Sequence, residues 1–399
     1  MGAIEVTTTA IAAGGDAVAR DADGRVVFVT GALPGERVRA EVTEERKDFA
    51  RARVVEVVDA AAERVAPPCP HVGRGCGGCT WQHVEPGAQR RLKADIVADA
   101  LRRQGRIPDP EVSAGPSLGP DARRTTLRVG AAAGGRLGFR RLRSHEVVDV
   151  DDCLVAHPLL SDLLVRCDAG EADELTLRCG ARTGERLVLA HPGAAGVDVP
   201  DGVVLVGEDE LAGGRRAWIT EEAAGRRWRV SARSFFQASP EGAEALVAAV
   251  AEAAGPVAPG DRVVDLYGGV GLFAGTVGAP ARTTFVERSA SAVADARVNL
   301  DGLDARVLRL DVDRWRPSPA DLVIADPARS GLGRRGVAAV AGTGAPLVVV
   351  VSCDPAALGR DASLLAAEGY TLERCATVDL FPHTPHVEVV SAFRRPVDG

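Results

Sequence analysis

The last third of the chain alternates apolar runs with stretches that predict helices. From Asp261 onward, short runs rich in valine, leucine and isoleucine recur, and helical patterns separate them. Two parallel strands can be joined only by a long crossover, which is usually a helix. This alternation therefore predicts βαβ units and a parallel sheet, so the C-terminal part of the chain is constrained to an α/β fold.

A helix is expected to begin at Ser239, just before this region. The Ser239 side chain can cap a helix, Pro240 suits the first turn, and Glu241 favours the positive end of the helix dipole. Leu246, Val247 and Val250 then lie on one apolar face. We expect this helix to pack against the predicted sheet.

The first predicted strand of this part runs into a glycine-rich turn. Asp265 precedes a turn that contains Gly269 and Gly271, and such a turn brings backbone close to a ligand at the carboxyl edge of a sheet. The next strand ends in Glu287, an acid that can bind both hydroxyls of a ribose. Dinucleotide proteins share both features, so the pattern alone does not separate them from S-adenosylmethionine enzymes. The choice depends on Asp326-Pro327, which ends a later strand where methyltransferases of this fold place their fourth motif.

The first 60 residues predict a small barrel. Short apolar strands between residues 4 and 58 are separated by turns rich in glycine and proline. Residues 108–232 mix strands and turns, and predict a mixed sheet. A helix is expected over residues 89–103. Two or three domains fit a chain of 399 residues.

Composition bounds the location and the partners. There is no apolar run of about 18 residues and no signal-peptide pattern, so we expect a cytoplasmic protein without a membrane span. A net charge of −7 argues against a nucleic-acid partner. Against this, residues 122–145 contain seven arginines and no acid. That segment is either a phosphate-binding patch or an ordinary solvated face.

Four of the eight cysteines have the spacing of ligands. Cys69 is followed after six residues by Cys76-Gly77-Gly78-Cys79, and Cys153 comes later. In a reducing compartment, thiols this close in sequence indicate a metal or a cluster rather than disulfides. An iron–sulfur cluster, a zinc ion and unliganded thiols all remain open on the spacing, although a zinc ribbon would have a second closely spaced pair.

Two segments near the C-terminus offer a nucleophile and a base. Cys353 follows an apolar strand, and Glu388 lies 35 residues later in the segment that also contains His383 and His386. A thiolate is the attacking form of cysteine, so the Cys353 thiol is expected to be at least partly ionised at neutral pH. The alternatives are a buried structural cysteine and a surface carboxylate.

Taken together, these motifs resemble the RNA uridine-5-methyltransferases, the TrmA/RlmD-like family. The resemblance covers nearly the whole chain. It is carried by the cysteine spacing, the loop at residues 31–36, Ser234-Phe235-Phe236-Gln237, Asp326-Pro327-Ala328-Arg329-Ser330-Gly331, Ser352-Cys353-Asp354-Pro355 and residues 381–388. The chain departs from the family pattern at Leu272, Ala328 and Asp354, where Asn, Pro and Asn are common.

The resemblance implies an OB-like TRAM β-barrel at residues 1–60, a mixed central domain with a [4Fe-4S] cluster at 61–232, and a Rossmann-like methyltransferase domain at 233–399. It implies that S-adenosyl-L-methionine is bound by Gln237, Tyr267, Gly269, Gly271, Leu272, Glu287, Asp311 and Asp326. The cluster ligands would be Cys69, Cys76, Cys79 and Cys153.

The implied reaction is methylation of uracil carbon 5 in RNA. Cys353 would attack carbon 6 and Glu388 would act as the general base. The combination of barrel and cluster resembles the enzymes of 23S rRNA more than the tRNA enzyme, so 23S rRNA is the expected substrate and tRNA the alternative. A noncatalytic RNA-binding or ribosome-assembly protein is a further alternative, and a monomer is expected.

Overall fold

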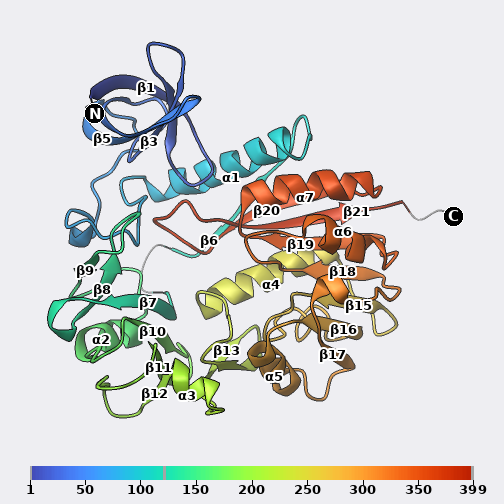
Figure 1. The fold of residues 1–399 in the computed structure, drawn as a ribbon. Coiled ribbons are helices and arrows are strands. Elements are labelled where there is room, and N and C mark those ends of the chain that lie inside the picture. The colour runs from blue at the N-terminus through green and yellow to red at the C-terminus, as the bar shows by residue number, and fades with distance from the viewer. Residues whose placement is uncertain (1, 120–122, 397–399) are drawn as a thin grey trace.

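The computed structural model describes residues 2–119 and 123–396, so Met1 and Ala122, which belong to stretches considered above, lie outside the described residues. In Figure 1 a small barrel lies at the top, a six-stranded sheet at the lower left and a larger sheet with its helices at the right. A long helix, α1 (Pro86–Arg103), runs between the barrel and the larger sheet.

The N-terminal strands close into a barrel with the order β1-β2-β3-β5-β4. Its strands are β1 (Ala3–Ile11), β2 (Ala17–Arg20), β3 (Val26–Thr30), β4 (Arg37–Glu45) and β5 (Phe49–Asp59). Apolar and polar residues alternate along β4, and every second side chain in its first half is buried. The predicted barrel is confirmed.

Helix α1 begins three residues earlier than the sequence pattern predicted. The Glu85 side chain caps it by accepting from the Ala88 N–H at 2.8 Å, and Pro86 occupies the first turn. Ile96 belongs to the barrel core, whereas Val97 and Leu101 belong to the core beneath the large sheet. The helix therefore joins the barrel to the C-terminal half of the chain.

The middle of the chain forms a six-stranded sheet of order β12-β11-β10-β7-β8-β9, preceded by the short helix η1 (Pro70–Val72). Only the β11–β12 pair is parallel, so the expected mixed sheet is present. The elements are β7 (Thr126–Ala131), η2 (Ala133–Gly135), β8 (Leu137–Arg140), β9 (Val147–Asp149), α2 (Pro158–Arg166), β10 (Glu174–Cys179), β11 (Arg186–His191), β12 (Val203–Gly207) and α3 (Glu208–Ala212).

The large sheet has the order β17-β16-β15-β18-β19-β21-β20-β6. Strands β15 to β19 are mutually parallel, which confirms the predicted βαβ units, and β21 is antiparallel to both of its neighbours. The strands are β6 (Ser113–Ser117), β15 (Arg262–Leu266), β16 (Arg282–Glu287), β17 (Ala305–Arg309), β18 (Leu322–Ala325), β19 (Leu347–Ser352), β20 (Thr371–Asp379) and β21 (Glu388–Arg394).

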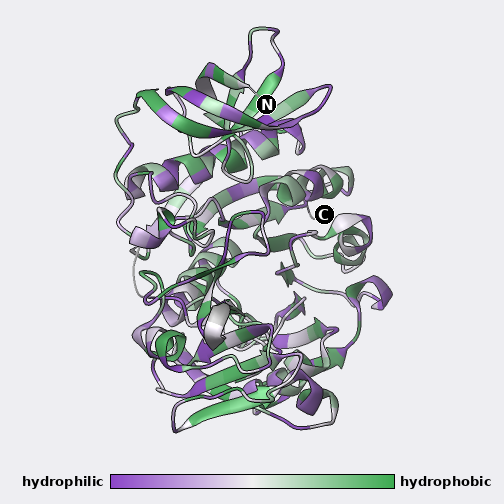
Figure 2. Ribbon diagram, turned by 60° about the vertical axis from the view of Figure 1, so that its left-hand side comes forward, coloured by the Kyte–Doolittle hydropathy of each residue, from purple (hydrophilic) through white to green (hydrophobic). Residues whose placement is uncertain are grey.

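Helices cover both faces of this sheet, and Figure 2 shows hydrophobic strands between more mixed helices. Helix α4 and the hairpin of β13 and β14 pack on one face, and α1, α6 and α7 pack on the other. The bounds are β13 (Trp218–Ala223), β14 (Arg226–Ser231), α4 (Pro240–Ala254), α5 (Ala290–Asn299), η3 (Val312–Arg314), α6 (Gly333–Ala341) and α7 (Pro355–Ala367). The Ser239 hydroxyl caps α4, as predicted, by accepting from the Gly242 N–H at 3.0 Å.

Several segments of the predicted central range pack elsewhere. Strand β6 is the edge strand of the large sheet, α1 packs on α7, and the β13–β14 hairpin packs on α4 and α5. Residues 61–232 thus contribute both to the six-stranded sheet and to the C-terminal half, and the boundaries at residues 60 and 232 remain predictions. No helix in the described residues is long and apolar enough to cross a membrane.

Candidate active site and cysteine pocket

A cavity of ≈ 600 Å³ lies where the parallel strands of the large sheet end. This size is typical of a pocket for a small ligand or cofactor. Most predicted site residues line it: Gln237, Tyr267, Gly269, Leu272, Glu287, Asp311, Asp326, Cys353 and Glu388. Gly271 belongs to the same turn but is not among the lining residues. The fold thus brings together side chains that are separated by up to 151 residues.

The glycine-rich turn after β15 has the backbone conformation that glycine permits. Gly269 and Gly271 have φ values of 57° and 98°, and a Cβ on Gly271 would lie 3.1 Å from the Leu300 side chain. The Glu287 carboxylate accepts from the Gly269 N–H at 3.2 Å and from the Ser289 N–H at 2.7 Å. The acid is therefore hydrogen-bonded to the glycine-rich turn at this end of the cavity.

Asp265 lies fully buried beneath the turn. One carboxylate oxygen accepts from the Ala274 N–H at 2.8 Å, and the other has no hydrogen-bond partner among the described residues. The pKa of Asp265 is raised to about 8, chiefly by burial and in addition by the nearby Asp326 and Glu287 carboxylates. Asp265 holds the loop that begins the cavity.

The segment that contains Gln237 is tied to two other elements. Arg178, from β10, donates to the carbonyls of Ser231 at 3.1 Å and Ser234 at 2.6 Å. The Ser234 hydroxyl donates to Asp295 on α5 at 2.6 Å. Gln237 is 6% exposed. These bonds determine where the segment enters the cavity.

Strand β21 brings Glu388 next to Cys353. Ser352 at the end of β19 pairs with Val389, and the two strands are antiparallel. Cys353, the residue after β19, therefore lies beside Glu388, the first residue of β21, at the same sheet edge. A nucleophile and a base far apart in sequence meet because of this register.

The Cys353 thiol is neutral at neutral pH in the protein chain alone. Its pKa is raised to about 11, by burial first and then by the carboxylates of Glu388 and Asp326, while Arg329 opposes this. The expectation that the thiol is partly ionised is wrong for this environment. The sequence showed the Cys353 motif but not the two acids that the fold places around it.

Two carboxyl groups of this site bind protons more tightly than usual. Burial raises the pKa of Asp326 to about 7. Burial, assisted by the Asp326 charge, raises the pKa of Glu388 well above its ordinary value, and Arg329 opposes this. A carboxylate with a raised pKa is suited to accept a proton near neutral pH.

The loop after β18 is held by the neighbouring helix α7. Asp361 accepts from the Leu332 N–H at 2.6 Å and from the Gly333 N–H at 3.0 Å. Gly331 has a φ of 71°, and a Cβ there would meet the Asp361 carboxylate. Asp354 caps α7 by accepting from the Ala357 N–H at 2.7 Å, which an Asn would also do.

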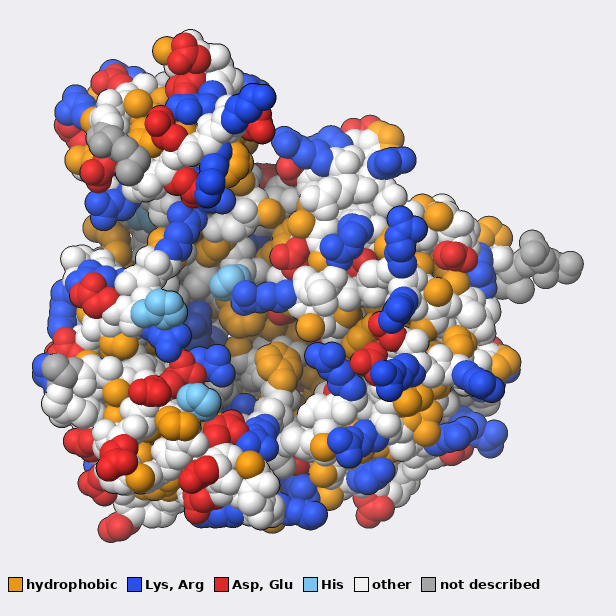
Figure 3. Space-filling model, in the orientation of Figure 1, with side chains coloured by type: hydrophobic (Ala, Val, Ile, Leu, Met, Phe, Trp, Pro, Cys, Tyr) orange, Lys and Arg blue, Asp and Glu red, His pale blue; other side chains and the backbone are white. Residues whose placement is uncertain are grey.

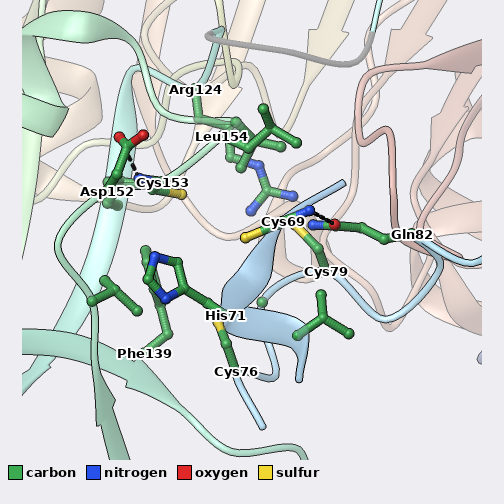
Figure 4. Close-up of a pocket in the computed structure, with 15 residues that line it drawn as sticks. Cys69, His71, Cys76, Cys79, Gln82, Arg124, Phe139, Asp152, Cys153 and Leu154 are labelled. Carbon is green, nitrogen blue, oxygen red and sulfur yellow. Dashed lines mark hydrogen bonds between the residues drawn. The ribbon is translucent and has the colours of Figure 1, made fainter. Parts of the chain in front are cut away.

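The four predicted ligand cysteines line a second, smaller cavity. Figure 4 shows Cys69 and Cys153 pointing toward one another across it, with Cys76 and Cys79 at its sides. Cys69, Cys76 and Cys79 come from the segment before α1, and Cys153 comes from the loop after β9. Gly77 N–H donates to the Arg140 carbonyl at 3.0 Å, which ties the cysteine segment to β8.

Among the described residues, no three His, Cys, Asp or Glu side chains are arranged to hold a single metal ion. A zinc site needs its four ligands around one ion, whereas a [4Fe-4S] cluster binds each thiolate at a different iron. Burial raises the pKa of Cys153 to about 11 and also raises those of Cys76 and Cys79.

The arginine-rich segment is largely neutralised by acids from elsewhere. Its ion pairs are Arg123–Glu241, Arg128–Glu174, Arg136–Asp149, Arg140–Glu174, Arg141–Glu146 and Arg143–Asp16. The fold therefore favours the solvated-face interpretation over a free phosphate-binding patch. Arg124 differs, because its side chain lines the cysteine cavity.

Two polar residues that hold the Glu388 loop were missed from the sequence. Gln89 and Lys93 lie on α1, are each 1% exposed, and contact the loop between β20 and β21. A signal was present, since Lys93 falls on the same helical face as Ile96, Val97 and Ala100. A charged residue within an apolar stripe indicates a buried partner.

A parallel sheet with a glycine-rich turn, an acid at the end of the second strand and a cavity at the strand ends is the arrangement of α/β enzymes that bind a nucleoside cofactor. The TRAM domain model matches residues 3–55. An uncharacterized RNA methyltransferase of Streptomyces coelicolor is 38% identical, over 99% of this chain and 93% of the relative.

A 23S rRNA (uracil(1939)-C(5))-methyltransferase, RlmD, of Halomonas elongata is 36% identical, over 98% of this chain and 89% of the relative. The chain belongs to the RNA uracil-5-methyltransferase family of RlmD- and TrmA-like, S-adenosylmethionine-dependent enzymes. The solved structure of a Pyrococcus abyssi tRNA (uracil-54, C5)-methyltransferase with S-adenosyl-L-homocysteine has the same fold. Its TM-score is 0.75 and its identity 23%, over 98% of this chain and 99% of that one.

Proposed function

We propose that this protein methylates carbon 5 of a uracil in 23S rRNA, with Cys353 as nucleophile and Glu388 as general base. The observation that supports this most is the shared cavity of Cys353, Asp326 and Glu388 with Glu287 and the glycine-rich turn. A thiol, a proton acceptor and a nucleoside-binding end in one cavity are the groups that this reaction needs.

Uracil carbon 5 is a poor nucleophile until a thiolate adds to carbon 6. Formation of the sulfur–carbon 6 bond sends the electron pair of the double bond toward carbon 5 and the neighbouring carbonyl. Carbon 5 then takes the methyl group, and the bond that would break is the one between this methyl and the sulfonium sulfur of the donor. Glu388 removes the proton left on carbon 5, the double bond re-forms, and the Cys353 thiolate leaves. Every bond that forms is matched by one that breaks, and no oxidant or reductant is consumed.

The Cys353 proton must leave before attack. The Cys353 thiol is only partly buried, so this proton can pass to solvent, and Glu388 stays reserved for the proton at carbon 5. When bound, S-adenosylmethionine supplies the methyl group on a positively charged sulfonium, which favours ionisation of the thiol. This accounts for a nucleophile whose pKa is high in the protein chain alone.

The methyl donor is proposed to lie along the turn after β15. Glu287 would bind the ribose hydroxyls, and Gln237, Tyr267 and Asp311 would contact the rest of the donor. Asp326, Gly269 and Gly271 complete the proposed set. Leu272 supplies only apolar contact, because its side chain has no hydrogen-bonding group.

One observation favours 23S rRNA over tRNA as the substrate, and two others support an RNA substrate of either kind. Relatives that cover almost the whole chain at 36% identity include a 23S rRNA enzyme, whereas the tRNA enzyme of similar fold is 23% identical. The TRAM domain supports an RNA partner. Figure 3 shows a hollow between the barrel and the two sheets with Lys and Arg side chains around it. A flipped uracil in structured RNA would enter from such a face, and the reaction would take place in the cytoplasm on a monomeric enzyme.

We also infer that Cys69, Cys76, Cys79 and Cys153 hold a [4Fe-4S] cluster. The four thiols line one cavity, and their spacing in the sequence lacks the second closely spaced pair of a zinc ribbon. Protein purified without oxygen should contain iron and acid-labile sulfide in equal amounts, and Cys153→Ser should lose both. Stoichiometric zinc without sulfide would overturn this inference.

The activity is tested by mapping 5-methyluridine in cellular rRNA and tRNA with and without the gene. We expect loss at one position of 23S rRNA, and loss confined to tRNA would overturn the substrate. The mechanism is tested with RNA tritiated at uracil carbon 5. Wild-type protein should release tritium, Cys353→Ala should release none, and Glu388→Gln should accumulate a covalent RNA–protein adduct after methyl transfer.

A further inference from the structure

The segment that follows Cys79 is hydrogen-bonded to the loop that leads to Glu388. This loop, residues 380–387, joins β20 to β21 and ends at Glu388, the first residue of β21. Trp81, two residues after Cys79, donates from its backbone N–H to the His383 carbonyl at 2.8 Å. Its indole N–H donates to the Gly15 carbonyl in the barrel at 3.1 Å. Three distant parts of the chain therefore meet at this loop.

Gln89 is the centre of this contact. Its side-chain oxygen accepts from the His383 N–H at 2.7 Å. Its side-chain nitrogen donates to the carbonyl of Val84 at 2.9 Å and lies 3.3 Å from that of Trp81. The side chain is 1% exposed, so no water replaces these bonds. One amide thus joins the cysteine-bearing segment to the loop.

Lys93, one helical turn further along α1, holds the start of the same loop. Its ammonium donates to Asp379 at 2.6 Å and to the Phe381 carbonyl at 2.9 Å. Lys93 is 1% exposed and Asp379 is 8% exposed. Asp379 is the last residue of β20, and its neighbour Val378 pairs directly with Glu388. The ion pair therefore lies against the backbone that carries Glu388.

The conformation of the loop requires such support. His383 is 4% exposed and has a φ of 63°, in the left-handed region that a residue with a side chain rarely adopts. Such a conformation costs about 1–3 kcal/mol and persists only where surrounding contacts impose it. The contacts here are the bonds from Trp81 and Gln89 on either side of the His383 peptide.

We propose that Gln89 and Lys93 are positioning residues for Glu388, and that they act on the removal of the carbon 5 proton rather than on the attack by Cys353. This inference rests on the proposed function. Cys353 follows β19, and β19 pairs with β21. None of the hydrogen bonds described above joins Gln89 or Lys93 to Cys353 or to β19. A shift of the loop would therefore displace the base more than the nucleophile.

The consequence is a specific separation of two rates. Displacement of a catalytic group by about 1 Å lowers the rate of its step about 10²-fold. In Gln89→Leu, methyl transfer to RNA in a single turnover should stay within a few-fold of the wild-type rate. Resolution of the methylated adduct, measured as the rate of tritium release, should slow about 10²-fold. A denatured gel should then show RNA joined to the protein, as for Glu388→Gln.

Two further variants keep the test open if Gln89→Leu does not fold. Gln89→Glu keeps the acceptor for the His383 N–H and should resolve the adduct faster than Gln89→Leu. The double variant Lys93→Met with Asp379→Asn removes the ion pair without leaving one buried charge unpaired, and it too should accumulate adduct. The matched control is Arg91→Ala on the same helix, whose side chain is exposed and pairs with Glu63. It should behave as the wild type does.

The outcomes separate this inference from the proposed function. If wild-type protein releases no tritium and Glu388→Gln forms no adduct, the proposed function itself fails. If both behave as expected but the Gln89 and Lys93 variants resolve the adduct at the wild-type rate, the positioning role is wrong. A parallel fall of methyl transfer and adduct resolution, with their ratio unchanged, would also overturn it, because that is the result of a general loss of folded protein.

Discussion

Asp295 on α5 offers a direct test of how the cofactor end of the cavity is held in place. Its carboxylate is fully buried and accepts from Arg229 Nε at 2.8 Å, the Ser231 N–H at 2.8 Å, the Ser231 hydroxyl at 2.7 Å and the Ser234 hydroxyl at 2.6 Å. Ser234 precedes Gln237 by three residues. Substitution of Asp295 with Ala therefore affects both the packing of the β13–β14 hairpin and the proposed donor site.

The expected loss of stability follows from the ion pair. Removal of one partner of a buried pair costs about 3–5 kcal/mol, because the other charge is left without compensation. The Arg229 side chain keeps 18% exposure and Ser234 keeps a contact with the Ser291 hydroxyl at 2.9 Å, so the lower end applies. A loss of about 3 kcal/mol lowers the melting temperature of a unit of 150–250 residues by about 6–12 °C.

The assay is thermal unfolding of Asp295→Ala beside the wild type, with S-adenosyl-L-homocysteine binding measured by calorimetry. Loss of one hydrogen bond from a displaced Gln237 should weaken binding by up to about tenfold. Asp295→Asn, which keeps the shape and one acceptor, should fall between the two. Asp301→Ala, exposed just beyond α5, is the control and should change neither quantity. A melting temperature for Asp295→Ala within about 2 °C of wild type would refute the reasoning.

Three further predictions concern the acids and the glycines. The rate of alkylation of Cys353 in the protein alone should rise with pH, with a midpoint near the Cys353 pKa of about 11. Glu388→Gln should lower this midpoint, because the Glu388 charge raises the Cys353 pKa. An unchanged midpoint would contradict the proximity of Glu388 to Cys353. Asp265 has a folded-state pKa of about 8, above its unfolded value, so its contribution to stability is present at acid pH and is lost as the pH rises through about 8. Asp265→Asn should therefore melt above the wild type at pH 8 and approach it near pH 4, and a constant difference would count against this. A Cβ on Gly77 would lie 2.6 Å from the Leu142 nitrogen, whereas one on Gly78 meets only the Cys76 sulfur at 3.7 Å, so Gly77→Ala should lose iron that Gly78→Ala retains; equal iron contents would disprove this.

Local spacing explains what could be predicted from the sequence. The alternating pattern of β4 and the cap at Ser239 depend on neighbours within a few residues, so they could be predicted without knowledge of the fold. The glycine-rich turn and the acid at Glu287 likewise belong to consecutive strands of one sheet. The cysteine spacing and the Cys353 and Glu388 segments could be recognised because each is a short motif that resembles one of the RNA uridine-5-methyltransferases.

Tertiary structure decided what depends on contacts between distant residues. The antiparallel register of β21 brings Glu388 to Cys353, and no local pattern specifies the partner of a strand. The same packing surrounds the thiol with two carboxylates, which reverses its expected ionisation, and supplies acids to arginines that had none in their own segment. Lys93 and Gln89 acquire their partners only when α1 packs against the 380–387 loop. Periodicity records which face of an element is buried, whereas pKa values and positioning contacts depend on which other faces are buried against it.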